Sequence, residues 1–187
     1  METSNYFKCI DLVIGRDVYK FDNLSHHHNG GQKMNIRKAT KEDLSRIAEI
    51  FVFNNRINYF PIFKQEDFSF GELQVVSLIE NYFGKTEIMD TLFVAEDNGI
   101  IKGFMEIWGT EIGKLYVEPC FQSGGVGDVL IKYAIQNLHV DFLWALEKNT
   151  RARAFYNRHG FIETGEKEHE EGTMEYLLKL VRREKVL

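Results

Sequence analysis

A glycine-rich stretch at residues 122–128, QSGGVGD, stands between a strand-like segment and a helix-like segment. Backbone N–H groups at the start of a helix converge on one point, where the helix dipole also favours an anion. Glycines are needed because a side chain would hold a bulky diphosphate away from these amides. The stretch therefore predicts a phosphate-binding loop, with a plain connector as the alternative. The expected ligand contacts come from Gln122, Ser123, Gly124, Gly125, Val126, Gly127 and Asp128.

Two common nucleotide-binding loops do not match this stretch. A P-loop requires a Lys-Ser or Lys-Thr pair after its last glycine, and no such pair follows Gly127. A dinucleotide-binding fingerprint requires three spaced glycines and an acidic residue about 20 residues later. Gly125, Gly127 and Glu147 match it, but Leu130 stands where the third glycine is required. The loop also follows an antiparallel run of strands instead of opening a parallel unit. A dinucleotide oxidoreductase is therefore the weaker hypothesis.

Hydrophobic periodicity and turn residues predict the elements that must position this loop. Thr40 and Asp43 form a capping-box-like helix start, and Asn98-Gly99 is a strong hairpin signal. An aromatic connector is expected at 56–70. Strands are expected at 35–40, 91–97, 100–109, 113–119, 141–148, 161–167 and 173–181, and helices at 41–55, 71–84, 126–139 and 150–160. The order predicts an α/β (α+β) fold with a mixed, mostly antiparallel central sheet flanked by helices.

Length and composition predict one globular domain with a short extension. The chain has 187 residues, of which 44% are hydrophobic, enough for one full core. A polar and glycine-rich linker at 25–33 separates residues 1–33, to which we assign no function, from a domain at 34–187. The run His26 to His28 could bind a metal only with further ligands, of which Cys9 is the sole obvious candidate, so a solvated linker without metal is expected.

Charge and hydropathy exclude several partners. The formal net charge of -5 gives no general electrostatic reason to bind nucleic acid or an anionic membrane, and favours a cationic partner. No apolar run approaches the roughly 20 residues that cross a bilayer. The chain has two cysteines and starts without a secretory signal, which predicts a cytoplasmic protein. A homodimer is left open.

Two blocks of sequence, taken together, resemble the GNAT superfamily of acetyl-CoA-dependent N-acetyltransferases. The first, KLYVEPCFQSGGVGD, fills the family's cofactor motif Gln/Arg-x-x-Gly-x-Gly/Ala with Gln122, Gly125 and Gly127. The second contains Asn149, Tyr156 and the pair Gly160-Phe161 at the separation found in family members. The order of elements from residue 35 onward is similar too, so the resemblance covers all but the first 33 residues.

The resemblance implies a V-shaped split between the fourth and fifth strands, into which acetyl-CoA enters. Its pantetheine arm is expected to pair with the backbone of Leu115, Tyr116 and Val117 and to contact Asn149, while its diphosphate rests on the glycine loop. The acceptor amine attacks the thioester directly. The Val117 N–H is a candidate oxyanion donor, and Tyr156 is the candidate acid for the departing thiolate.

The general base is left between two glutamates, Glu111 and Glu147, with water as a further proton relay. Cys120 lies close to the loop, but no histidine is placed to activate it, so an acyl-enzyme is the weaker route. The acidic segment at 163–171 favours a primary amine acceptor that carries additional positive charge. A non-catalytic acyl-CoA-binding sensor or interaction module is the alternative function, and the acceptor amine cannot be named from the sequence.

Overall fold

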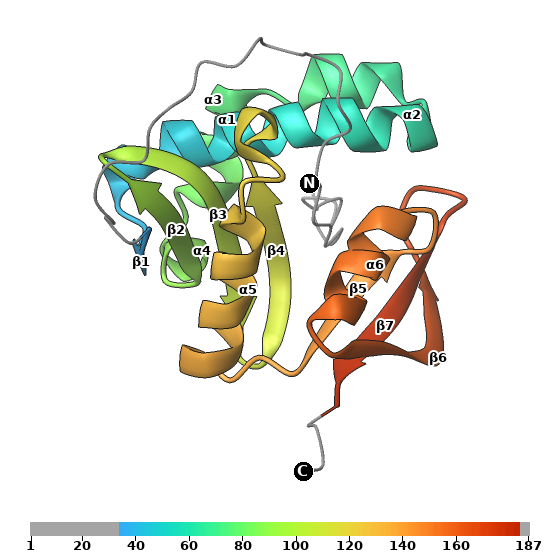
Figure 1. Cartoon of the computed structure of the whole chain (residues 1–187). Helices are drawn as coiled ribbons and strands as arrows, with labels where there is room; N and C mark the ends of the chain where they lie inside the picture. Colours follow the sequence, from blue (N-terminus) through green and yellow to red (C-terminus); the bar gives the residue numbers. More distant parts are fainter. Residues whose placement is uncertain (1–33, 184–187) are drawn as a thin grey trace, which may run out of the picture.

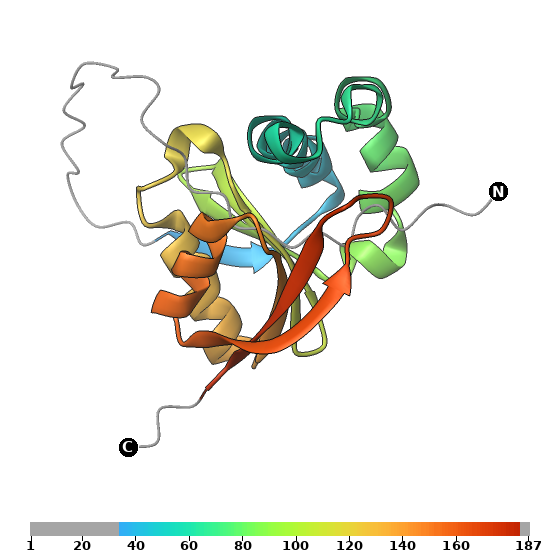
Figure 2. The same ribbon diagram turned by 90° about the vertical axis from the view of Figure 1, so that its right-hand side faces the viewer.

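The computed structural model describes residues 34–183, which form a seven-stranded sheet covered by helices on both faces (Figures 1 and 2). The spatial order is β1-β2-β3-β4-β5-β7-β6, and the only parallel pair in this sheet is β4 with β5. This is the mixed, mostly antiparallel sheet that the sequence predicted. The strands are β1 Asn35–Lys38, β2 Leu92–Asp97, β3 Ile100–Trp108, β4 Glu111–Val117, β5 Phe142–Leu146, β6 Phe161–His169 and β7 Tyr176–Arg182.

The first four strands form an antiparallel run in which local turn chemistry sets the register. Asn98 and Gly99 both have positive φ, 53° and 77°, as a two-residue hairpin turn of type I′ requires. The predicted hairpin between β2 and β3 is therefore confirmed. The backbone N–H of Thr40 donates to Asp43 Oδ2 at 2.8 Å, which confirms the capping interaction at the first helix.

The fourth and fifth strands pair over a short distance and then diverge (Figure 1). Their register joins Glu111 to Phe142 and Ile112 to Leu143, at the amino ends of both strands. Directly afterwards the pairing of β3 with β4 shifts and leaves Gly113 as an extra residue in β4. Such a bulge bends a strand and increases its twist. The bulge therefore lies where the predicted split between β4 and β5 begins.

Beyond the bulge, alternate amides of β4 point into the split. The Glu118 N–H donates to the carbonyl of Lys102 at 2.9 Å, on the side of β3. Because successive residues of a strand direct their backbone groups to opposite sides, the amides of Leu115 and Val117 point away from β3. They face the direction in which β5 has diverged.

Helices form one layer on each face of the sheet (Figure 2). Helix α5, Val126–Asn137, and helix α6, Thr150–Arg158, cover one face, where Leu115, Val117, Leu130 and Phe155 belong to one buried cluster. The other face carries α1 Leu44–Asn54, α2 Phe60–Phe63, α3 Val75–Leu78 and α4 Thr86–Met89. Tyr116 faces this second layer, so consecutive residues of β4 contribute to opposite cores.

The segment expected to be an aromatic connector is largely helical, which corrects the sequence-based prediction. After α1 the chain continues through a π-helical turn η2, Asn55–Tyr59, then α2 and a second π-helical turn η3, Asp67–Glu72. Pro61 near the start of α2 has no N–H to donate to the preceding turn, so the regular hydrogen-bond ladder is interrupted there. The helix expected at 71–84 is shorter, because α3 gives way to a π-helical turn η4, Ile79–Phe83.

A buried ion pair connects β3 and β4 beneath η4. Lys114 Nζ lies 2.9 Å from Glu106 Oε1, and both side chains are almost fully buried. Tyr82 OH and Trp108 Nε1 donate further hydrogen bonds to the same carboxylate. Burial and the charge of Glu106 raise the pKa of the Tyr82 phenol far above its usual value, so it remains a donor.

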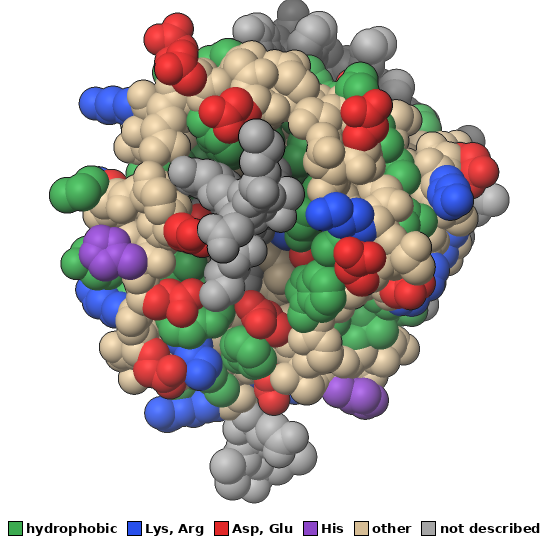
Figure 3. Space-filling model, turned by 180° about the vertical axis from the view of Figure 1, so that it is seen from behind, with side chains coloured by type: hydrophobic (Ala, Val, Ile, Leu, Met, Phe, Trp, Pro, Cys, Tyr) green, Lys and Arg blue, Asp and Glu red, His purple; other side chains and the backbone are tan. Residues whose placement is uncertain are grey.

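Within residues 34–183, no helix is long and apolar enough to cross a membrane, and no group of three or more side chains is arranged to bind a metal. On the face opposite α5 and α6, acidic side chains are scattered among the others and no continuous basic surface is visible (Figure 3).

Candidate active site

The glycine loop forms the start of α5, as its sequence predicted. Gly125 immediately precedes the helix with φ 83°, a conformation that L-amino acids with a side chain rarely adopt. The first helical hydrogen bond runs from the Val129 N–H to the Gly125 carbonyl at 3.1 Å. The amides of Val126, Gly127 and Asp128 therefore precede the regular ladder, and they point toward the helix start, where an anion binds favourably.

A pocket of about 240 Å³ lies in front of this loop. It brings together most of the loop with the end of β4 and one side of α6. Its lining residues are Val117, Phe121, Gln122, Ser123, Gly125, Val126, Gly127, Asp128, Phe155 and Arg158. Gly124 is absent from this lining, and a Cβ at that position would lie 3.3 Å from the Phe121 carbonyl. The loop and Val117 thus share one cavity.

The first motif residue, Gln122, is held from two sides. Its Nε2 donates to the Val117 carbonyl at 3.1 Å and to Asn54 Oδ1 at 3.2 Å. Asn54 is fully buried at the end of α1, and its own amide donates to the same Val117 carbonyl at 3.1 Å. Among the described residues, the buried Gln122 Oε1 has no hydrogen-bond partner. Gln122 thus connects the glycine loop to the ends of β4 and α1.

The predicted contacts on β4 divide between backbone and side chain. The side chains of Leu115 and Val117 are buried against the α5 layer. The ring of Tyr116 stacks on Phe104, with ring centroids 5.5 Å apart, on the opposite face. These three side chains therefore pack the two cores, and the strand offers a ligand its backbone amides instead.

Tyr156 and Asn149 both belong to α6. Tyr156 is fully buried in the same cluster as Leu115 and Val117, with its ring 5.9 Å from that of Phe161. Asn149 caps the helix, because its Oδ1 accepts from the Ala152 N–H at 3.0 Å. The cap uses the side-chain oxygen of Asn149, so its side-chain NH2 group can donate to a ligand.

The two candidate bases lie at opposite ends of the split. Glu111 begins β4, six residues before Val117, which amounts to about 20 Å along a strand. Glu147 directly follows β5 at the open end, but its Oε1 lies 2.6 Å from Lys167 Nζ. The hydrogen bond from Lys167 lowers the pKa of Glu147, which weakens it as a base. Glu111 is therefore far from Val117, while Glu147, in an exposed ion pair, stays the candidate at the open end.

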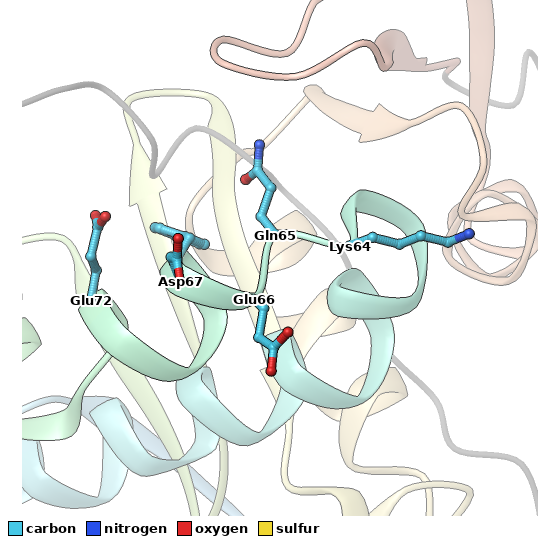
Figure 4. Close-up of a pocket in the computed structure, with 6 residues that line it drawn as sticks. Lys64, Gln65, Glu66, Asp67 and Glu72 are labelled. Carbon is cyan, nitrogen blue, oxygen red and sulfur yellow. The ribbon is translucent and has the colours of Figure 1, made fainter.

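A larger cavity, of about 530 Å³, lies at the turn between α2 and η3, away from the glycine loop (Figure 4). Lys64 extends away from Asp67 and Glu72, while Gln65 Nε2 donates to the Gly172 carbonyl in the connection between β6 and β7. Apart from Phe68, its lining residues are polar or charged. This geometry carries no chemistry by itself, but it places the α2–η3 turn against the β6–β7 connection.

The acidic segment at 163–171 is partly neutralised. Glu163 lies 2.7 Å from an Arg153 nitrogen, and Glu166 lies 3.0 Å from Lys179 Nζ. These two carboxylates therefore contribute less to an attractive field for a cationic acceptor than the sequence suggested.

Sequence reasoning did not assign a function to Asn54, Arg158 or His159, all of which lie at this site. Asn54 is 68 residues from Gln122, and no local pattern predicts that contact. Arg158 and His159 end α6, and only the packing of α6 beside α5 brings them to the loop. Their role could therefore be recognised only from the three-dimensional structure.

Comparisons with known proteins agree with this fold. A family model described as an acetyltransferase (GNAT) domain matches residues 89–163. An uncharacterized N-acetyltransferase of Archaeoglobus fulgidus is 30% identical over 141 residues, which are 66% of this chain and 89% of that relative. The chain therefore belongs to the GNAT superfamily of acetyltransferases.

Solved structures with this fold are more distant in sequence. The apo form of YjaB from Escherichia coli has a TM-score of 0.59 at 23% identity, covering 80% of this chain and 97% of that one. The PaiA N-acetyltransferase of Thermoplasma acidophilum, solved in complex with coenzyme A, has a TM-score of 0.56 at 18% identity. That match covers 79% of this chain and 98% of the other. At these identities the likeness concerns the fold.

Proposed function

We propose that this protein transfers the acetyl group of acetyl-CoA to a primary amine. The observation that carries the proposal is the glycine loop, which begins α5 at the open end of two diverging strands and shares a pocket with Val117. The diphosphate of acetyl-CoA would rest on the amides of residues 126–128. Its pantetheine arm would pair with the backbone of Leu115 and Val117 and with the amide of Asn149.

The proposed reaction is a direct attack. The amine nitrogen forms a bond with the thioester carbonyl carbon, the carbon–sulfur bond breaks, and the nitrogen loses a proton. The Val117 N–H donates to the developing oxyanion, and Tyr156 donates a proton to the departing sulfur. The proton from nitrogen leaves through water at the open end of the split, where Glu147 is the proposed final acceptor. Glu111, at the closed end, has no part in this scheme.

The loop assignment predicts the effect of two substitutions. Gly125→Val places a branched side chain at positive φ, and Gly127→Val crowds the buried start of α5, so both are expected to weaken acetyl-CoA binding strongly. Calorimetric titration measures the affinity. Gly99→Ala, at another glycine of positive φ in the distant β2–β3 hairpin, is the control and should bind acetyl-CoA like the parent. If Gly127→Val binds as tightly as the parent, the loop is only a connector.

The acyl-CoA sensor is the alternative function, because a sensor would keep the same loop and pocket. Mixing the protein with acetyl-CoA and a panel of primary amines separates the two. An enzyme releases free thiol with at least one amine, whereas a sensor binds acetyl-CoA without accelerating thiol release.

Comparing mono-amines with polyamines in the same panel, at low and high salt, tests the preference for additional positive charge.

We also propose that residues 34–187 form the catalytic domain and that residues 1–33 are an extension. The motif residues all lie beyond Met34, and β1 begins at Asn35. A protein that starts at Met34 is expected to retain its melting temperature and its affinity for acetyl-CoA. A folded but non-binding truncation would show that the extension completes the site.

A further inference from the structure

The last turn of α6 lies against the first turn of α5, beside the glycine loop. His159 Nε2 is 2.7 Å from Asp128 Oδ1, and the side chain of Arg158 lines the pocket. Phe155 supports both residues: its ring centroid is 4.7 Å from that of His159 and 5.6 Å from the Arg158 guanidinium carbon. The proposed mechanism has so far given no role to Arg158 or His159.

Asp128 presents an electrostatic difficulty for the proposed ligand. It lies in the first turn of α5, where a carboxylate stabilises the helix but also competes with another anion. Its side chain is 47% exposed, so it can turn toward the pocket unless another group holds it. Asp128 and Arg158 are the two charged side chains in the described lining of this pocket. A diphosphate would therefore meet one negative and one positive group.

We propose, on the basis of the function proposed above, that the end of α6 completes the phosphate site of the cofactor. Arg158 binds a phosphate group of coenzyme A directly. His159 is a positioning residue: its hydrogen bond holds the Asp128 carboxylate away from the phosphate. The requirement for His159 therefore depends on the presence of Asp128.

This dependence is tested by a double-mutant cycle. The affinity of CoA is measured by calorimetry for the parent and for His159→Gln, Asp128→Asn and the double variant. His159→Gln is expected to weaken CoA binding about 10-fold, because a charged hydrogen bond is lost and Asp128 is released. Asp128→Asn should bind at least as tightly as the parent, and the double variant should bind like Asp128→Asn.

The role of Arg158 is tested by comparing Arg158→Gln with a control variant. Arg158→Gln is expected to weaken CoA binding about 10-fold or more and to reduce its dependence on salt. Lys85→Gln, which removes an exposed positive charge near α4, is the control and should have no effect. Repeating the titrations with dephospho-CoA identifies the phosphate: a loss with both ligands indicates the diphosphate, and a loss with CoA alone indicates the 3′-phosphate.

The possible failures are distinct. A parent protein that does not bind CoA contradicts the proposed function itself. If the parent binds CoA but His159→Gln and the double variant are equally weak, His159 does not act through Asp128. If Arg158→Gln binds CoA as Lys85→Gln does, Arg158 is not a phosphate ligand. Melting temperatures of all variants show whether each remains folded.

Discussion

Replacing Tyr156 with Phe is expected to lower the turnover number about 10- to 1000-fold, with a smaller effect on the Michaelis constant for acetyl-CoA. The substitution removes the phenol proton donor and keeps the ring that packs among Phe155, Phe161 and the β4 side chains. Because the acid acts only while the thiolate departs, its loss should appear in the chemical step rather than in cofactor binding. Thiol release with a saturating amine measures this effect.

Tyr133→Phe provides the matched control, since it also removes a phenol oxygen, from a partly buried tyrosine on α5. The control should turn over like the parent. A thioester whose thiol is a better leaving group should restore much of the rate of Tyr156→Phe, because such a thiol depends less on an acid. A variant that loses affinity for acetyl-CoA but keeps its turnover number would show that Tyr156 only packs the core.

The order of elements could be predicted because each boundary has a local signal. Thr40 with Asp43, the pair Asn98-Gly99 and the glycine loop each mark a start or a turn, and periodicity identifies the segments between them. The structure confirms these boundaries to within a few residues. The fold class and the family could therefore be predicted from the sequence.

Contacts between distant segments had no comparable signal. The helical segment from η2 to η3 was mistaken for a connector, because its density of aromatic residues hides the periodicity and Pro61 interrupts the ladder. Glu147 was one of two candidate bases, and no pattern in the sequence indicated that Lys167, 20 residues later, forms a hydrogen bond with it. The pairing depends on the approach of β6 to the end of β5, which is a consequence of the tertiary fold. Side-chain partners of this kind decide whether a candidate residue has the required chemistry.

Breaking the buried ion pair between β3 and β4 is expected to be costly. Lys114→Met should lower the free energy of unfolding by about 3–5 kcal/mol, because it leaves the Glu106 carboxylate buried without its cation. Urea denaturation measures the change. Lys148→Met, which breaks an ion pair with Glu175 at a lysine that is 60% exposed, is the control and should cost no more than about 1 kcal/mol.

The double variant Lys114→Met with Glu106→Leu separates the pair's net contribution from the penalty of an unpaired charge. Replacing both partners with apolar side chains should recover much of the lost stability, because no charge then remains buried. Tyr82 and Trp108 would lose their shared acceptor, so recovery is expected to be incomplete. If Lys114→Met is as stable as the parent, the donors from Tyr82 and Trp108 are sufficient to hold the Glu106 carboxylate. A double variant less stable than Lys114→Met would instead show that the hydrogen-bond network, rather than the charge balance, stabilises the junction of β3 and β4.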